Sequence, residues 1–229
     1  ISITYLQVCE IDSEHWYNVC LNCGEYRADK IIDRSGSYAV CPLCKHEHPF
    51  LQLPLLIVSG ASGSGKSAIR YFLTNSTKGV IMLEGDLLWR PEFDKPNEKY
   101  RDFFETWLRL CKNISQAGKP VVIFNAGFGV RENVEPCVER RYFSKLHYLA
   151  LTCDDEVLPE RLRARPQWRK SGKLDDIKAQ ILLNRWFKEQ AGKVEPFLEL
   201  IDTTDATIEE SSNMVALWIQ KVLSNYDLS

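Results

Sequence analysis

The amino-acid sequence predicts an α/β fold, in which helices cover a five-stranded parallel sheet, preceded by a small β module. Three observations lead to this prediction. From residue 51 onward, short apolar runs alternate with helical patterns at the spacing of strand–helix–strand units. Residues 1–50 show only short strand-like pieces separated by turns. The length of 229 residues is enough for one α/β domain and one smaller unit.

The boundary is expected near residue 50, which gives one module over residues 1–50 and a second over residues 51–229. In the first, strand-like pieces cover His15–Cys20 and Ser37–Cys41. In the second, the expected strands are Leu55–Ser59, Gly79–Glu84, Val121–Asn125, Leu146–Thr152 and Phe197–Ile201. The expected helices are Ser67–Leu73, Glu98–Gln116, Glu156–Arg165, Leu174–Gln190 and Ile208–Leu223. Strands and helices that alternate in this way predict a parallel sheet with helices on both faces.

Composition and charge disfavour several classes of protein. Apolar residues make up 45% of the chain and charged residues 26%, the usual balance of a globular domain. No stretch approaches the roughly 20 apolar residues of a membrane helix, so a membrane partner is not expected. The formal net charge of −2 disfavours a nucleic acid as the main partner.

Four of the eight cysteines form two C-x-x-C pairs, Cys20 with Cys23 and Cys41 with Cys44. Seventeen residues separate the pairs, the spacing of a four-cysteine zinc ribbon. A module of about 50 residues buries too little surface for reliable stability, so a structural Zn²⁺ would supply folding free energy. Thiol exchange is the alternative for such pairs. The remaining cysteines are scattered, and a reducing cytoplasmic location fits both groups.

A glycine-rich motif follows the first strand of the larger module. Its pattern, G-x-x-x-x-G-K-S, stands between an apolar run and a helix, the context of a phosphate-binding loop. Glycines let successive backbone N–H groups point at phosphate oxygens, and the helix N-terminus adds a partial positive charge. Lys66 is expected to reach the β- and γ-phosphates, and the Ser67 hydroxyl to hold Mg²⁺. The residues expected to bind the nucleotide are Gly60, Ala61, Ser62, Gly63, Ser64, Gly65, Lys66 and Ser67.

Asp86 is the first candidate on the acceptor side. It closes the run Leu83-Glu-Gly-Asp86 at the carboxyl end of the second strand, the edge of the sheet at which ligands bind. A carboxylate there can accept the proton of an attacking hydroxyl or help to hold the metal. The alternative is that Asp86 caps the following turn.

These motifs resemble the P-loop kinases of small metabolites, nucleosides and nucleotides. The resemblance covers nearly all of residues 54–223 and implies the sheet order 2-3-1-4-5, with the phosphate loop on the central strand. It implies that Asp86 orients or deprotonates the acceptor hydroxyl, and that Leu149–Asp154 leads into a lid. The ending Ile201-Asp-Thr-Thr204 resembles the loop beside the nucleotide base. One departure is Asn125, which ends the third strand where the family usually has an acidic metal ligand.

The lid is expected near residues 159–173, a segment that is rich in basic side chains. Positive charge stabilises the equatorial oxygens in phosphoryl transfer, and a closing lid excludes water. Arg161 and Arg165 are the first candidates for this role. The alternative is a solvated basic helix face. The basic residues of the segment are Arg161, Arg163, Arg165, Arg169, Lys170 and Lys173.

The acceptor pocket is harder to read. Trp89 and Phe93 are candidates to stack on a base, whereas Phe103, Phe104 and Trp107 have the helical spacing of core residues. Several arginines are candidates to bind an acceptor phosphate: Arg90, Arg101, Arg131, Arg140 and Arg141.

Three functions remain open at this point. The leading hypothesis is an ATP- and Mg²⁺-dependent kinase of a small acceptor, with a nucleoside or nucleotide favoured. The second is a polynucleotide 5′-hydroxyl kinase, which the acidic ribbon, with four Lys/Arg against seven Asp/Glu, disfavours. The third is a nucleotide-binding regulator whose ribbon contacts a protein partner or forms a dimer contact.

Overall fold

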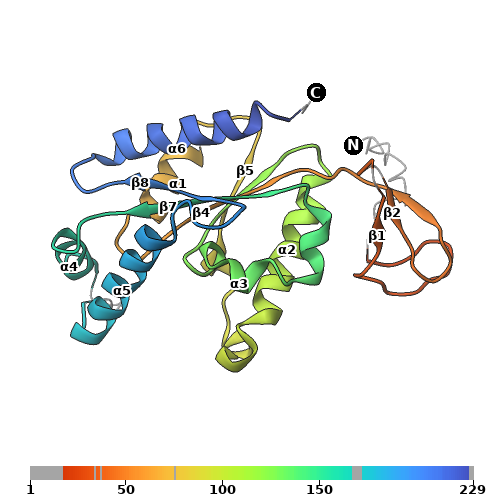
Figure 1. Ribbon diagram of the computed structural model, residues 1–229, viewed down its shortest axis with the longest axis horizontal. Coiled ribbons are helices and arrows are strands. Elements are labelled where there is room, and N and C mark those ends of the chain that lie inside the picture. The colour runs from red at the N-terminus through yellow and green to blue at the C-terminus, as the bar shows by residue number, and fades with distance from the viewer. Residues whose placement is uncertain (1–17, 34, 37, 75, 167–171, 227–229) are drawn as a thin grey trace, which may run out of the picture. The chain divides into compact units, whose positions relative to one another are not determined.

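The computed structural model describes residues 18–33, 35–36, 38–74, 76–166 and 172–226. The chain divides into two compact units, Ile1–Gln52 and Leu53–Ser229, and Figure 1 shows the elements of both. Several residues considered above lie outside the described residues, namely His15–Tyr17, Ser37, Arg169 and Lys170.

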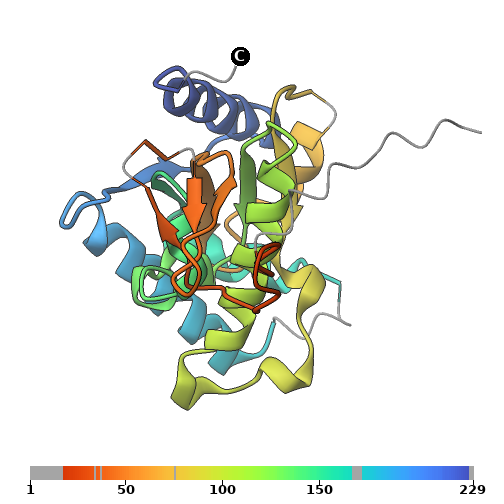
Figure 2. The ribbon, with the colours of Figure 1, turned by 90° about the vertical axis from the view of Figure 1, so that its right-hand side faces the viewer.

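The smaller unit contains a three-stranded antiparallel sheet, drawn in orange in Figure 2. Its strands are β1 (Ile31–Ile32), β2 (Tyr38–Val40) and β3 (Glu47–Pro49), paired in the order β1-β2-β3. An isolated bridge joins Val19 to Tyr26 before this sheet. The buried apolar side chains of the unit are few: Cys20, Ala39, Cys41 and Phe50.

The larger unit is built on a five-stranded parallel sheet, as the sequence predicted. Its strands are β4 (Leu55–Gly60), β5 (Ile81–Glu84), β6 (Val121–Phe124), β7 (Leu146–Thr152) and β8 (Leu198–Asp202). They lie side by side in the order β5-β6-β4-β7-β8, which is 2-3-1-4-5 when counted along this unit. The central strand β4 is buried along its whole length, and the phosphate loop follows it.

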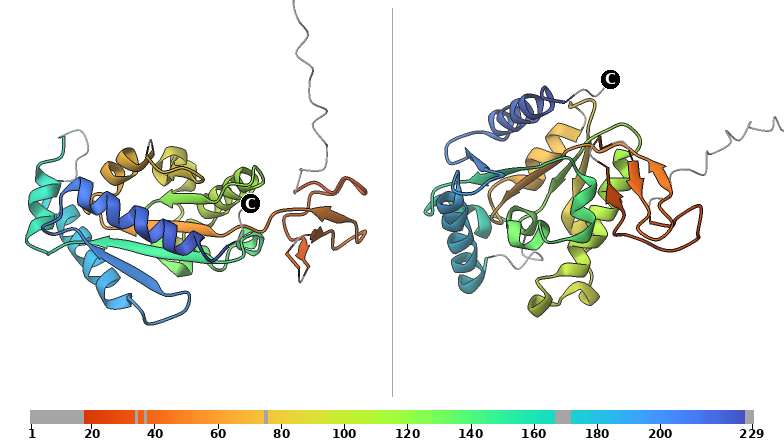
Figure 3. Two further views of the ribbon diagram at one scale, coloured as in Figure 1. Left: turned by 90° about the horizontal axis from the view of Figure 1, so that it is seen from above. Right: turned by 45° about the vertical axis from the view of Figure 1, so that its right-hand side comes forward.

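Helices cover both faces of the sheet, because the side chains of β4 alternate between two apolar clusters. On one face, Leu56 and Val58 pack against α1 (Lys66–Thr74) and α6 (Ile208–Leu223). On the other, Leu55 and Ile57 pack against α2 (Arg101–Ser115) and α5 (Leu174–Gln190). Figure 1 shows α6 and α1 above the sheet and α2 and α5 below it, and Figure 3 shows the same division from two other sides.

The differences from the sequence prediction lie at helix ends and in connections. Helix α2 begins at Arg101 instead of Glu98, because Pro96–Glu98 forms a 3₁₀ turn and Lys99 and Tyr100 have left-handed backbones. Helix α4 (Val157–Arg163) ends two residues before the expected Arg165, ahead of Pro166. The sequence also gave no sign of the short helix α3 (Arg131–Val134) between β6 and β7.

Within the described ranges, no helix is both long enough and apolar enough to cross a membrane.

Candidate nucleotide-binding and metal sites

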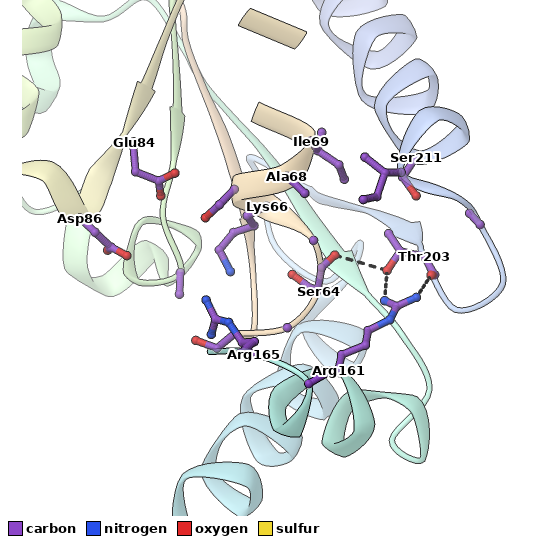
Figure 4. Close-up of a pocket in the computed structure, with 18 of the residues that line it drawn as sticks. Ser64, Lys66, Ala68, Ile69, Glu84, Asp86, Arg161, Arg165, Thr203 and Ser211 are labelled. Atoms are coloured by element: carbon purple, nitrogen blue, oxygen red, sulfur yellow. Dashed lines mark hydrogen bonds between the residues drawn. The ribbon is translucent and has the colours of Figure 1, made fainter. Parts of the chain in front are cut away.

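A cavity of about 940 Å³ opens at the carboxyl ends of the strands in the larger unit (Figure 4). The phosphate loop forms one wall, and the end of β5 forms another. Segments from the lid region and from the loop after β8 complete the lining. Its residues are Ser62–Ile69, Glu84, Asp86, Ala126, Arg161, Ala164, Arg165, Pro166, Thr203, Ala206, Ile208 and Ser211. The structure therefore brings together most of the residues that the sequence assigned to the site. Gly60 and Ala61 do not line this cavity; they lie at the base of the loop.

The shape of the phosphate loop depends on its glycines. Gly60 has a φ of +133°, and a Cβ added there would lie 2.3 Å from the Leu151 carbonyl oxygen. Gly63 has a φ of +90°, and an added Cβ would lie 3.0 Å from Leu158 Cδ1. Both positions therefore exclude a side chain, through backbone conformation and through space. This explains the glycine at each position without reference to a ligand.

Lys66 is the first residue of α1, and its ammonium folds back over the loop. Its Nζ donates hydrogen bonds to Gly60 O at 2.6 Å and Ala61 O at 2.9 Å. The pKa of Lys66 is lowered to about 8, chiefly by burial, with a smaller contribution from the charge of Arg165; Asp86 and Glu84 act in the opposite direction. An anionic phosphate in the cavity would favour the charged form. Ser67, the candidate Mg²⁺ ligand, is exposed and lines the cavity beside it.

Asp86 lies across the cavity from the loop (Figure 4). It sits in the 3₁₀ turn Gly85–Leu88, and its Oδ1 accepts a hydrogen bond from Asn125 Nδ2 at 2.9 Å. The residue at the N-cap of this turn is Glu84, and no side chain caps the turn. The capping alternative for Asp86 is therefore not what this geometry shows.

The side chain of Asn125 is itself held in place by hydrogen bonds. Its Oδ1 accepts hydrogen bonds from the backbone N–H groups of Gly127 and Phe128, at 2.8 and 3.3 Å. With its oxygen bound in this way, its nitrogen faces Asp86. Gly85 allows this contact, because a Cβ at residue 85 would lie 2.5 Å from Asn125 Cβ. The amide at the end of β6 thus orients the carboxylate at the end of β5.

Two neighbours of Asp86 support the same turn. Glu84 also lines the cavity, and its Oε2 accepts a hydrogen bond from Arg70 Nε at 3.1 Å. Trp107 of α2 is fully buried, and its Nε1 donates to Gly85 O at 2.9 Å. Trp107 therefore belongs to the core, as its spacing predicted, and it also fixes the backbone next to Asp86.

The two lid arginines have different surroundings. Arg161 of α4 donates from Nη1 to Thr203 Oγ1 at 3.0 Å, and from Nη2 to the carbonyl oxygens of Thr203 and Thr204 at 2.5 and 3.0 Å. Figure 4 shows this guanidinium turned toward Thr203, whereas Arg165 lies beside Lys66. Arg165 is therefore the one placed near the phosphate loop. Arg161 instead ties α4 to the loop after β8.

The aromatic and basic residues suggested for an acceptor are engaged elsewhere in the protein. Phe93 is buried and packs against Phe103 in the core, whereas Trp89 is about half exposed. Neither lines the cavity. Each of the five arginines contacts another protein group. The pairs are Arg90 with Phe93, Arg101 with Cys137, Arg131 with Val194, Arg140 with Glu135, and Arg141 with Val138.

The loop after β8 forms the opposite end of the cavity from Asp86. Thr203 Oγ1 donates to Thr152 O at 3.0 Å, which fixes this loop to the end of β7. Helix α6 then begins with a capping box, in which Thr207 Oγ1 accepts from Glu210 N and the Glu210 carboxylate accepts from Thr207 N. Ala206, Ile208 and Ser211 line this end of the cavity and give it a mixed apolar and hydroxyl surface.

The smaller unit holds the four-cysteine cluster. The Sγ atoms of Cys20 and Cys44 lie 3.4 Å apart, those of Cys23 and Cys41 lie 3.9 Å apart, and all four lie within 4.8 Å of one another. In a tetrahedral site with Zn–S bonds of about 2.3 Å, the sulfur atoms lie about 3.8 Å apart. The cluster therefore has the dimensions and the donor atoms of a Zn²⁺ site, and the paired cysteines are confirmed as one cluster.

Sequence reasoning missed two contacts in the candidate site, one at the phosphate loop and one at Asp86. Gln180 of α5 accepts a hydrogen bond from Ser62 N through Oε1 at 2.7 Å. Asn125 was recognised as a departure from an acidic residue, but its role in holding Asp86 was not. The residues of the first contact stand 118 positions apart, so a single sequence carries no signal for it.

Comparison with solved structures supports the fold of the larger unit. A sugar kinase from Janibacter sp. HTCC2649 is 18% identical, with a TM-score of 0.51 over 73% of this chain and 95% of that one. A gluconokinase from Sinorhizobium meliloti 1021 is also 18% identical, with a TM-score of 0.46 over 76% and 95%. No protein-family model and no curated protein sequence matches the chain. The likeness to the sugar kinase shows that this chain contains a domain with the fold of that protein.

Proposed function

We propose that this protein is an ATP-dependent phosphotransferase that moves the γ-phosphoryl group to a hydroxyl of a small acceptor. One observation carries the proposal. A single cavity has a phosphate loop with its lysine on one side and an oriented carboxylate, Asp86, on the other. Phosphoryl transfer needs this pairing of an anion cradle with a group that receives the acceptor's proton.

In the proposed reaction, the loop amides and Lys66 bind the β- and γ-phosphates. Asp86 accepts the proton of the acceptor hydroxyl while the oxygen of that hydroxyl forms a bond to the γ-phosphorus. The bond from that phosphorus to the bridging β–γ oxygen breaks, and ADP leaves. Arg165, next to Lys66, stabilises the charge that develops on the transferred group.

The residues present fit a divalent cation at the phosphates. Ser67 offers a hydroxyl at the mouth of the cavity, and Asp86 and Glu84 offer carboxylates on its far wall. Mg²⁺ held by these residues would neutralise part of the negative charge of the phosphates. Because Asn125 is neutral and its oxygen is held by two backbone amides, the carboxylate available from a strand end is that of Glu84 or Asp86.

The acceptor that we propose is a nucleoside or nucleotide. The arginines suggested for an acceptor phosphate already contact other protein groups, and this favours a nucleoside. If Arg101 or Arg140 bound a phosphate of the acceptor, it would have to give up its present contact with Cys137 or Glu135. For the smaller unit we propose a structural Zn²⁺ held by Cys20, Cys23, Cys41 and Cys44, and a role in contacting a protein partner or a second copy.

The test is transfer of label from γ-labelled ATP in the presence of Mg²⁺. The acceptors are pooled nucleosides, nucleoside monophosphates, sugars and other small metabolites, and 5′-hydroxyl oligonucleotides. We expect label on one small-molecule pool and none with the Lys66→Ala variant. Label on the oligonucleotides would replace the proposal with the polynucleotide kinase. Label that stays on ATP or appears only as free phosphate would overturn phosphotransfer and favour a nucleotide-binding regulator.

A further inference from the structure

The phosphate loop is tied to the helix that follows the lid region. Gln180 stands in the second turn of α5, which begins at Leu174 just after the candidate lid. Its Oε1 accepts a hydrogen bond of 2.7 Å from the backbone N–H of Ser62. Ser62 lines the cavity, whereas Gln180 is not among the described residues that do. Any influence of Gln180 on a nucleotide therefore passes through the loop.

Apolar packing joins the same parts of the protein. Ala61 of the loop is buried in a small cluster with Leu158 and Leu162 of α4 and Ile177 of α5. Gly63 approaches the two leucines so closely that an added Cβ would lie 3.0 Å from Leu158 Cδ1. The loop thus rests on both helices that flank the lid region. A movement of either helix would be felt at the loop, because packed interiors transmit displacement.

The other flanking helix has a polar connection of its own. Arg161 of α4 donates to Thr203 Oγ1, and this hydroxyl lies 3.4 Å from Ser64 O as well as 3.0 Å from Thr152 O. This route is indirect, since it passes through the loop after β8. The contact from α5 is direct and short. Gln180 therefore links α5 directly to the backbone of the phosphate loop.

A second carboxamide on α5 serves as a comparison. Asn184, one turn after Gln180, donates to Cys153 O at 2.7 Å and accepts from Cys153 N at 3.3 Å. It is fully buried and fixes α5 to the end of β7. Asn184 thus anchors the helix to the sheet. Gln180 stands nearer to the lid and reaches the cradle itself.

We propose that Gln180 is a positioning residue that holds Ser62 in the phosphate-binding conformation and ties the phosphate loop to α5. The inference rests on the nucleotide binding that is part of the proposed function, but it does not depend on the transfer step. A loop that is already ordered loses less conformational entropy when phosphates bind. Removing the tether should therefore weaken nucleotide binding.

Three variants test this role. Gln180→Met keeps the length of the side chain and removes the acceptor. Gln180→Glu keeps an acceptor at the same reach. Gln190→Met places the same substitution at the far end of α5 and is the matched control. The readouts, on the full chain, are the Kd for ATP with Mg²⁺ by calorimetry, the exchange rate of the Ser62 amide by NMR, and the Tm.

We expect Gln180→Met to raise the Kd for ATP about fivefold, which corresponds to the loss of one net hydrogen bond. The same variant should exchange the Ser62 amide faster. Gln190→Met should change neither the Kd nor the exchange rate. In Gln180→Glu the Ser62 amide should stay protected. Wild-type affinity and exchange in Gln180→Met, or a lower Tm as its only effect, would overturn the inference. ATP binding that depends on Gln180 in a protein that transfers no phosphoryl group would support this inference and overturn the proposed function.

Discussion

The two compact units of this chain hold their sites by different means. In the smaller unit the four thiol groups come from two turns close in sequence, and few apolar side chains are buried around them. In the larger unit the cavity is lined by segments that span residues 62–211, and two apolar clusters support the sheet between them. On the proposal that the cluster holds Zn²⁺, the first site depends on the ion for its fold, whereas the second is shaped by the apolar core of the larger unit.

The largest effect predicted by this comparison is the loss of zinc. Removing the metal with a chelator, or replacing Cys41 with Ser, should unfold the smaller unit, because a structural zinc site contributes about 10–16 kcal/mol to folding. The larger unit should keep its ATP affinity within about twofold, since its cavity is lined only by its own described residues. NMR spectra of the two units and metal analysis would measure this. A chain that contains no zinc and keeps every signal from the smaller unit would contradict it.

Next in size is the effect of Asp86→Asn, which removes the proposed base. We expect kcat to fall by about 10²–10⁴-fold, the usual contribution of general base catalysis, with the Kd for ATP nearly unchanged. The control is Asp94→Asn, the same substitution at an exposed position that does not line the cavity, and it should leave kcat unchanged. A wild-type kcat in Asp86→Asn would remove Asp86 from the reaction.

A smaller effect is expected from Asn125→Asp. The new carboxylate keeps an acceptor for the Gly127 and Phe128 amides but replaces the donor that faces Asp86. Two carboxylates at this distance share a proton, which raises the apparent pKa of the pair. We expect kcat at neutral pH to fall about tenfold, with the acid limb of the pH–rate profile moved to higher pH. The exposed Asn113→Asp on α2 is the control, and an unshifted profile in Asn125→Asp would contradict the role of Asn125.

The smallest effect concerns pH and Lys66. Burial holds the pKa of Lys66 at about 8, and bound phosphate favours the protonated form, so binding takes up a proton above that pH. The contribution of Lys66 to ATP affinity should not change with pH below about pH 8. Above that pH, ATP affinity should fall by up to about tenfold per pH unit. Lys66→Arg keeps its charge and should bind with a flat profile over the same range. A flat profile in the wild-type protein would contradict the lowered pKa.

The same comparison shows which features could be predicted from the sequence. The cysteine pairs and the loop at Gly60–Ser67 are local patterns, so their spacing alone predicted the cluster and one wall of the cavity. The expected bounds of α5 and α6 agree with the structure to the residue. Asp86 was found because it closely follows the end of a recognisable strand.

Other features depend on contacts between distant segments. Nothing in the sequence indicates that Asn125 holds Asp86, that Arg161 turns to Thr203, or that Gln180 reaches Ser62. The arginines suggested for an acceptor phosphate show the same difficulty. Arg140 is a residue of the type that binds anions, but its guanidinium donates hydrogen bonds to Glu135 and to the Phe143 carbonyl oxygen. Which charged groups are used within the fold is decided by packing and not by sequence spacing.

The most direct measurement follows the γ-phosphate itself in a single turnover, with γ-labelled ATP, Mg²⁺ and the pooled acceptors. Wild-type protein should place the label on an acceptor hydroxyl. Asp86→Asn should still bind ATP but transfer at least about a hundredfold more slowly. Lys66→Ala should transfer nothing. Equal transfer by wild type and Asp86→Asn, or label found only as free phosphate, would contradict the proposed phosphotransfer.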